Sequence, residues 1–111
     1  MTAPILAAPI LSALPDLDAL LGREARDTLL RLGVTHGDRA RVAIAAALAA
    51  GDTKTARAEA HGLRGAVAPF GAAALAALLA RVEHGEAVPA AEVDGGIAGF
   101  VEACREALAK E

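Results

Sequence analysis

Apolar residues recur at helical spacing along most of the chain. In the clearest stretch they are separated by four, three and four residues, which places them on one stripe of an α-helix. These positions are Ala56, Ala60, Leu63 and Val67. The same kind of periodicity predicts helices over residues 38–50, 53–68, 72–84 and 90–110. The pattern therefore predicts four substantial helices that follow one another closely.

Turn-forming residues separate the predicted helices. The run Gly51-Asp52-Thr53 predicts a helix stop and a new start, with Asp52 or Thr53 as the N-cap. Pro69 ends the next helix, and Gly71 makes a tight connection to the one that follows. Short connections place consecutive helices side by side and antiparallel, so we expect an all-α fold, an up-down-up-down four-helix bundle.

The chain before residue 38 is less regular. Residues 5–14 are apolar and predict a short extra helix or an arm lying across the bundle. Pro15 followed by Asp16 predicts a helix start. The apolar face of this helix would consist of Leu17, Leu20 and Leu21.

A second helical run begins at Arg23, after a break at Gly22. Its apolar positions include Ala25, Leu29, Leu30 and Leu32. Two glycines four apart, Gly33 and Gly37, are compatible with a loop or with a weak point inside one long helix. Beyond them the predicted helix of residues 38–50 carries Val42, Ile44, Ala45 and Leu48.

Composition narrows the class of protein. A chain of 111 residues with 55% hydrophobic and 2% aromatic residues fits a single helical domain over residues 1–111. The net charge of −3 argues against a nucleic-acid partner. The single cysteine, Cys104, excludes an internal disulfide and lies in an apolar helical pattern, which predicts a buried thiol.

The N-terminal apolar stretch differs from a targeting or membrane segment. It is short, has no basic leader, and is interrupted by Pro4 and Pro9. We therefore expect a cytoplasmic protein that does not enter a membrane. Met1 and a full set of four helices favour a free-standing protein over a fragment of a larger kinase.

Residues 60–65, with the sequence Ala-His-Gly-Leu-Arg-Gly, carry the candidate chemistry. On a helix, His61, Arg64 and Gly65 share a face next to the apolar stripe. A neutral imidazole nitrogen is a competent nucleophile near neutral pH, and a guanidinium one turn away can neutralise phosphoryl oxygens. Each mid-helix glycine costs about 0.5–1 kcal/mol relative to alanine, which favours a site or a close approach. The alternative is an ordinary surface histidine.

This run resembles the signature of the histidine-phosphotransfer (HPt) family, His-any-Leu-Lys/Arg-Gly, with a further glycine six residues on, here Gly71. The preceding segment, residues 48–52, is similar to the end of the preceding HPt helix. The following helix resembles the leucine-rich HPt helix that closes with an apolar-Glu pair, through Leu75, Leu78, Leu79 and Glu83. The resemblance covers about residues 40–84, and the helices that bear the motif span about residues 38–84.

The resemblance implies a role for each matched residue. His61 would accept the phosphoryl group through its outward ring nitrogen, and Arg64 would neutralise phosphoryl charge. Gly65 would leave clearance for a partner, and Gly71 would make the helix connection. The sequence identifies no partner for the other ring nitrogen of His61.

The resemblance also implies partners. They would be the receiver domain of a response regulator, which would supply an aspartate and Mg²⁺, and a sensor or chemotaxis-type histidine kinase. The chain has no nucleotide-binding signature, so an autonomous kinase is not expected, and it needs no cofactor of its own. Two alternatives remain: an HPt-like bundle that docks on receivers or kinases without being phosphorylated, and an unrelated helical interaction domain. The separations of His36, His61 and His84 match no compact zinc motif.

Overall fold

The computed structural model describes residues 10–110, which form α-helices and one 3-10 turn and contain no strand. The α-helices are α2 (Leu14–Leu21), α3 (Arg23–Ala49), α4 (Thr53–Val67), α5 (Ala73–Glu83) and α6 (Ala90–Ala109). The 3-10 turn, η1, covers Ala68–Phe70 and joins α4 to α5. The prediction of an all-α fold is therefore confirmed. Residues 5–9 of the predicted N-terminal segment lie outside the described residues.

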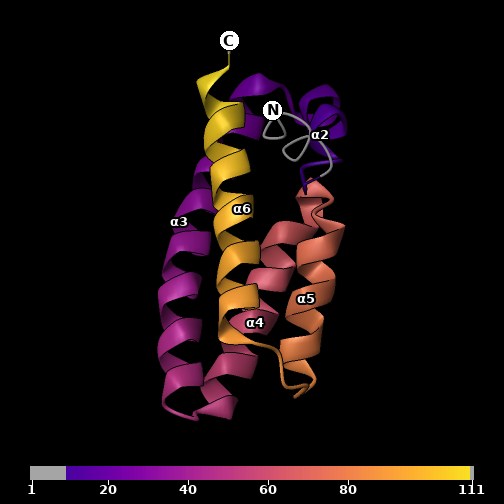
Figure 1. Ribbon diagram of the computed structural model, residues 1–111. Helices are drawn as coiled ribbons and strands as arrows, with labels where there is room; N and C mark the ends of the chain where they lie inside the picture. The colour runs from indigo at the N-terminus through magenta and orange to yellow at the C-terminus, as the bar shows by residue number, and fades with distance from the viewer. Residues whose placement is uncertain (1–9, 111) are drawn as a thin grey trace, which may run out of the picture.

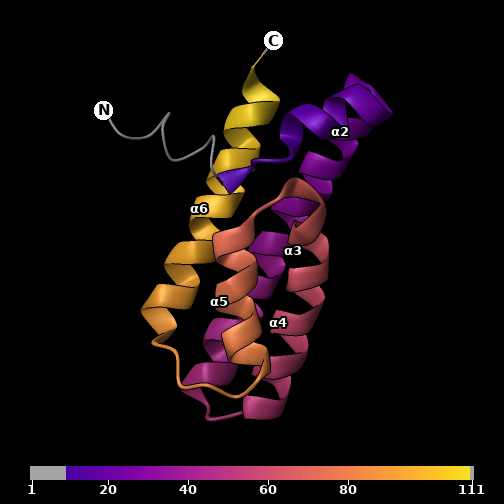
Figure 2. The same cartoon turned by 90° about the vertical axis from the view of Figure 1, so that its right-hand side faces the viewer.

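The four longest helices lie side by side along one axis of the molecule (Figure 1). α3 packs against α4 and α6, while α4 also packs against α5. The shorter helix α2 lies at the end of the molecule where α6 finishes (Figure 2). Within residues 10–110 no helix combines the length and the apolar character needed to cross a membrane.

The two glycines at 33 and 37 lie inside one continuous helix, α3, rather than in a loop. Both are buried against α6. A Cβ atom added to Gly37 would lie 2.6 Å from Cγ2 of Val101, and one added to Gly33 would lie 3.4 Å from the ring of Phe100. These glycines therefore allow the backbones of α3 and α6 to approach closely.

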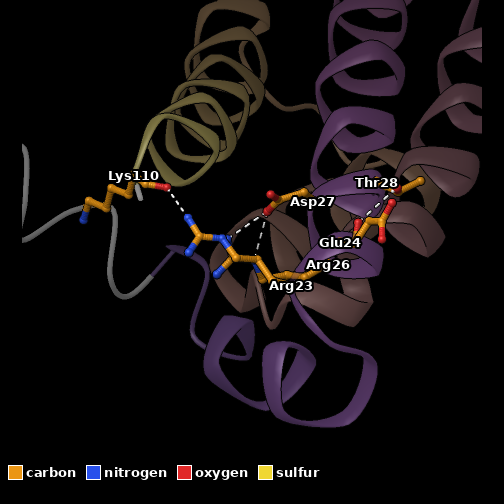
Figure 3. A network of polar contacts seen from close by, with 6 residues as sticks. All are labelled: Arg23, Glu24, Arg26, Asp27, Thr28 and Lys110. Atoms are coloured by element: carbon orange, nitrogen blue, oxygen red, sulfur yellow. Dashed lines mark hydrogen bonds and ion pairs between the residues drawn. The ribbon is translucent and has the colours of Figure 1, made fainter.

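Polar contacts also hold α3 to α6. Arg41 makes a two-pronged ion pair with Asp94, at 2.6 and 3.0 Å, and Arg105 contacts Asp38 at 2.9 Å. At the end of α6, Nη2 of Arg23 donates a hydrogen bond to the main-chain oxygen of Lys110 at 2.6 Å (Figure 3). A cation at the carboxyl end of a helix offsets the negative end of its dipole.

The rest of the polar network in Figure 3 is local to the first turns of α3. Arg26 and Asp27 form an ion pair at 2.8 Å, and both side chains are partly buried. The hydroxyl of Thr28 donates to the main-chain oxygen of Glu24 at 3.1 Å. These contacts join residues of the first two turns of α3 to one another.

A single core runs through the helices that lie side by side. The rings of Phe70 and Phe100 meet edge to face with centroids 5.7 Å apart. The predicted stripe of α4 is buried, and so is Cys104, as the sequence predicted. Burial raises the pKa of the Cys104 thiol to about 12.

Several apolar residues of the predicted helices do not lie in the core. Val42 is 71% exposed, Leu32 is 59% exposed and Leu20 is 80% exposed. The buried stripe of α3 consists of Leu30, Gly33, Gly37, Ala40, Ile44 and Ala47. Val42 lies two residues from two members of this stripe, about half a helical turn away, and so points outward. No residue of α2 is buried, because this helix lies at one end of the molecule, beside the last turns of α6 and away from the middle of the long helices (Figure 2).

The predicted helix boundary at residues 51–53 is confirmed. The carboxylate of Asp52 accepts a hydrogen bond from the main-chain nitrogen of Thr55 at 3.2 Å, which makes Asp52 the N-cap of α4. The side chain of Thr55, and after it the main-chain nitrogen of Thr55, lower the pKa of Asp52.

Candidate functional site

His61 lies on the outer surface of α4, just beside the buried stripe of that helix. Its side chain is 68% exposed. The stripe residues Ala60 and Leu63 face the core on either side of it in sequence, so the helical register turns the imidazole outward. The histidine is therefore anchored by a rigid helix and remains open to another molecule.

One nitrogen of the ring has a protein partner. Nδ1 of His61 lies 2.7 Å from Oε2 of Glu83, which is the last residue of α5. α4 and α5 lie side by side and are joined through η1. His61 and Glu83 stand at similar sequence distances on either side of Gly71, and the packing of α4 against α5 brings them together.

Glu83 also contacts two arginines of α4. Nη2 of Arg64 lies 2.7 Å from Oε1 of Glu83, an ion pair that lacks the alignment of a hydrogen bond. Nε of Arg57 donates a hydrogen bond to the main-chain oxygen of Glu83 at 2.8 Å. The side chain of Glu83 is only 20% exposed. Glu83 therefore contacts three side chains of α4, those of Arg57, His61 and Arg64, from a position closer to the core.

The surroundings of Glu83 determine which ring nitrogen carries the proton. The hydrogen bond with His61 is the main cause that lowers the pKa of Glu83, and the charge of Arg64 acts in the same direction against the effect of burial. An ionised carboxylate only accepts hydrogen bonds, so Nδ1 of His61 must be the donor. In the neutral ring, Nε2 then carries the lone pair. Within residues 10–110 no group forms a hydrogen bond with Nε2.

The glycines beside His61 do not serve internal packing. A Cβ atom added to Gly62 or to Gly65 would meet no atom within 4 Å, and both residues are exposed. They differ in this respect from Gly37, where an added Cβ would clash with Val101. The exposed residues near His61 include the small residues Ala58 of α4 and Ala68, the first residue of η1. Small residues and the two arginines Arg57 and Arg64 therefore surround the imidazole on this face.

The candidate residues from the sequence fall into two places. His61, Arg64 and Gly65 share one face of α4. Gly71 lies in the connection before α5, with a left-handed φ of 71°. Its main-chain oxygen accepts a hydrogen bond from the hydroxyl of Ser12 at 2.9 Å, so Gly71 orients the connection and does not contact the histidine.

Sequence reasoning missed the roles of Glu83 and Arg57. In the sequence, Glu83 stands out only as the end of the helix that resembles an HPt helix, and Arg57 does not stand out at all. The signal that would have found Glu83 is its position opposite His61 across the turn at Gly71. The part of the chain that the structure describes contains no group of three or more His, Cys, Asp or Glu side chains arranged to hold a metal ion.

Two hollows in the described surface lie apart from this site. One, of about 520 Å³, lies between α5 and α6 and is lined mainly by Ala, Leu and Gly side chains. The other, of about 380 Å³, lies between α3 and the end of α4 and includes His36. Neither hollow includes His61 or Glu83.

Comparison of the chain with protein-family models, with curated proteins and with solved structures finds no match.

Proposed function

We propose that this chain is a histidine-phosphotransfer module of a two-component phosphorelay. In this proposal α3, α4, α5 and α6 form an up-down-up-down four-helix bundle, and α2 is an addition to it. The observation that carries the proposal is the exposed His61, whose Nδ1 is bound by Glu83 at 2.7 Å. Its Nε2 is left as an outward, unprotonated nucleophile.

The proposed step is attack by Nε2 of His61 on the phosphorus of a partner's aspartyl phosphate. The bond from Nε2 to phosphorus forms, the bond from phosphorus to the aspartyl oxygen breaks, and the carboxylate leaves. No proton has to be removed from Nε2. The ring gains positive charge, and the carboxylate of Glu83 stabilises that charge through the proton on Nδ1. The reverse step delivers the phosphoryl group to a second receiver aspartate.

We expect the guanidinium of Arg64 to contact the negative charge that phosphorylation adds to His61. In the unphosphorylated protein its guanidinium is held beside Oε1 of Glu83 by charge, without an aligned hydrogen bond. A phosphoryl group on Nε2 would present three acceptor oxygens one helical turn away. We expect Arg64 to share its donors between Glu83 and these oxygens.

Gly65 supports the approach of a partner. In-line transfer requires the donor aspartate and the acceptor nitrogen to come within bonding reach. A side chain at this position would stand beside the imidazole on the same face of α4, and nothing in residues 10–110 occupies that space. The receiver domain would supply the Mg²⁺ and the aspartate, while a sensor or chemotaxis-type kinase would supply the phosphoryl group.

The test is transfer of radiolabel from phosphorylated receiver domains to the chain, comparing wild type with His61→Gln. His84→Gln is a matched control, because His84 is also exposed and stands next to Glu83 at the end of α5. We expect acid-labile, alkali-stable label in wild type and in His84→Gln, and none in His61→Gln.

A folded wild-type protein that takes no label from any receiver or kinase would overturn the proposal. Receiver binding that survives in His61→Gln, together with absence of label, would instead support a docking module that is not phosphorylated. Circular dichroism of each variant shows that the helices are intact.

A further inference from the structure

Arg57 is tied to the candidate site by a contact that its sequence position does not reveal. It lies one helical turn before His61, as Arg64 lies one turn after it. Its Nε donates a hydrogen bond at 2.8 Å to the main-chain oxygen of Glu83, the residue that also holds Nδ1 of His61. The two guanidinium groups therefore flank the imidazole along α4, and both are fixed to the same residue of α5.

This contact engages only part of the Arg57 guanidinium. Arginine has five N–H donors, and the hydrogen bond to Glu83 engages the one on Nε. Within residues 10–110 no acceptor binds either Nη atom of Arg57, and the side chain forms no ion pair. Arg57 is thus held in place with donors and a full charge still available.

The negative charge of a phosphoryl group on His61 would exceed the positive charge that Arg64 alone can supply. A phosphoryl group carries a charge of about −1.5 to −2 near neutral pH. Arg64 is already paired with the carboxylate of Glu83, so its charge is partly compensated before any phosphoryl group arrives. Arg57 has no such counterion among the described residues.

We propose that Arg57 is a second phosphoryl-contacting residue, whose Nη atoms donate to the oxygens of a phosphoryl group on Nε2 of His61. This inference rests on the proposed function of His61. The carbonyl of Glu83 keeps the Arg57 side chain extended beside the imidazole, so the guanidinium requires little reordering when the anion forms.

The alternative role for Arg57 is a purely structural one. Glu83 ends α5, and its main-chain oxygen is one of those that a helix leaves without an internal partner. A cation that caps this oxygen would stabilise the end of α5 and would have no effect on chemistry at His61 beyond stability. The rate at which His61 is phosphorylated distinguishes the two roles, because a helix cap changes stability and not this rate.

The test uses phosphoramidate as the phosphoryl donor and the full chain of wild type, Arg57→Gln, Arg57→Lys and Lys54→Gln. In this reaction Nε2 of His61 forms a bond to phosphorus, the P–N bond of phosphoramidate breaks, and its nitrogen leaves as ammonia. Phosphohistidine is followed by ³¹P NMR, and the rate constant is measured over a range of salt concentrations. Lys54→Gln is matched in charge, because Lys54 lies on the same face of α4, one turn further from His61.

We expect Arg57→Gln to lower the rate constant by about tenfold, the effect of one charge-assisted hydrogen bond, and to weaken its salt dependence. Arg57→Lys should recover part of the rate. Lys54→Gln should remain within about twofold of wild type, as an exposed charge without a specific contact does. In wild type, the Nε–H signal of Arg57 should shift in ¹⁵N NMR when His61 is phosphorylated.

Equal rates for Arg57→Gln and Lys54→Gln, with phosphohistidine formed in both, would overturn this inference and leave the proposed function standing. Absence of phosphohistidine in folded wild type would overturn both. If the Arg57 variants fold poorly, the Nε–H signal of Arg57 in the wild-type protein distinguishes the two roles. An Arg57 side chain that only caps α5 would give the same signal before and after phosphorylation of His61, and this result would overturn the inference.

Discussion

Nδ1 of His61 and Oε2 of Glu83 lie 2.7 Å apart and join the middle of α4 to the last residue of α5. Because the carboxylate is ionised, this contact fixes both the orientation of the ring and the position of its proton. An exposed imidazole would otherwise rotate freely. The relationship therefore converts a surface histidine into one with a defined outward nitrogen.

Removal of the Glu83 carboxylate should allow the neutral ring of His61 to adopt both tautomers. We expect ¹⁵N NMR of wild type, at a pH where the ring is neutral, to show the proton on Nδ1 of His61. Glu83→Ala should give a mixture of both tautomers and slow phosphoryl transfer by about tenfold, as the loss of a charge-assisted hydrogen bond predicts. The same ¹⁵N pattern in wild type and Glu83→Ala would contradict this assignment.

Acid should weaken the fold through specific carboxylates. The pKa of Glu83 lies below its ordinary value of 4.5, chiefly because of its hydrogen bond with His61, and that of Asp94 lies below 3.8, chiefly because of Arg41. A lowered pKa in the folded state adds stability that is fully present above the unfolded pKa and is lost as pH falls through the folded value. We therefore expect the melting temperature, followed by circular dichroism, to fall steadily below about pH 5.

Asp94→Asn provides the check on that pH dependence. This variant lacks the carboxylate that pairs with Arg41, so its melting temperature should be lower than that of wild type near neutral pH and should change less in acid. Identical acid sensitivity in wild type and Asp94→Asn would show that this carboxylate does not contribute.

Two kinds of helix glycine should respond in opposite ways to alanine. Gly37→Ala places a methyl group 2.6 Å from Val101, so it should destabilise the fold by about 1–3 kcal/mol, as overpacking does. Gly62→Ala meets open space and should stabilise α4 by about 0.5–1 kcal/mol. Urea unfolding of the two variants measures both effects. A loss of stability in Gly62→Ala would show that its surface is not open.

Bulk beside His61 should block transfer without unfolding the protein. Gly65→Leu adds a large side chain on the face of α4 that carries the imidazole, and we expect its phosphoryl transfer from a receiver to fall by about tenfold or more. Gly95→Leu is the matched control, because Gly95 is also exposed in a helix with open space around it, on α6. Equal transfer rates for the two leucine variants would show that the receiver domain does not approach His61 over Gly65.

The thiol of Cys104 should be inert in the folded protein. It is fully buried, and burial raises its pKa to about 12, so almost no thiolate forms near neutral pH. We expect no reaction with an aromatic disulfide reagent until denaturant is added, followed by titration of one thiol per chain. Rapid labelling of the native protein would indicate that α6 opens readily.

The features that depend on local sequence were predictable. The stripe of α4, the cap at Asp52 and the burial of Cys104 each follow from residue types within a few positions of one another. The face of a helix that packs depends instead on its neighbours. Val42 belongs to an apolar run yet lies outside the stripe that α4 and α6 cover, and this could not be inferred without the arrangement of the helices.

The candidate site was predictable only in part for the same reason. His61, Arg64 and Gly65 lie within one helical turn, so their common face follows from helix geometry. Glu83 lies 22 residues from His61, and its contact depends on how α4 and α5 are aligned by η1. The glycines at 33 and 37 looked like a loop or a weak point, because sequence alone does not show that α6 presses against them.

The close contact of Gly37 with Val101 has a consequence for how such a chain diverges. α3 and α6 meet through glycine and interlocking apolar side chains, so their facing positions tolerate little substitution. In contrast, Ala58 and Gly62 of α4 are exposed and take no part in this packing. Substitutions can therefore change the surface around His61 while the fold stays the same. A duplicated copy of the chain could acquire a new partner through a few such substitutions.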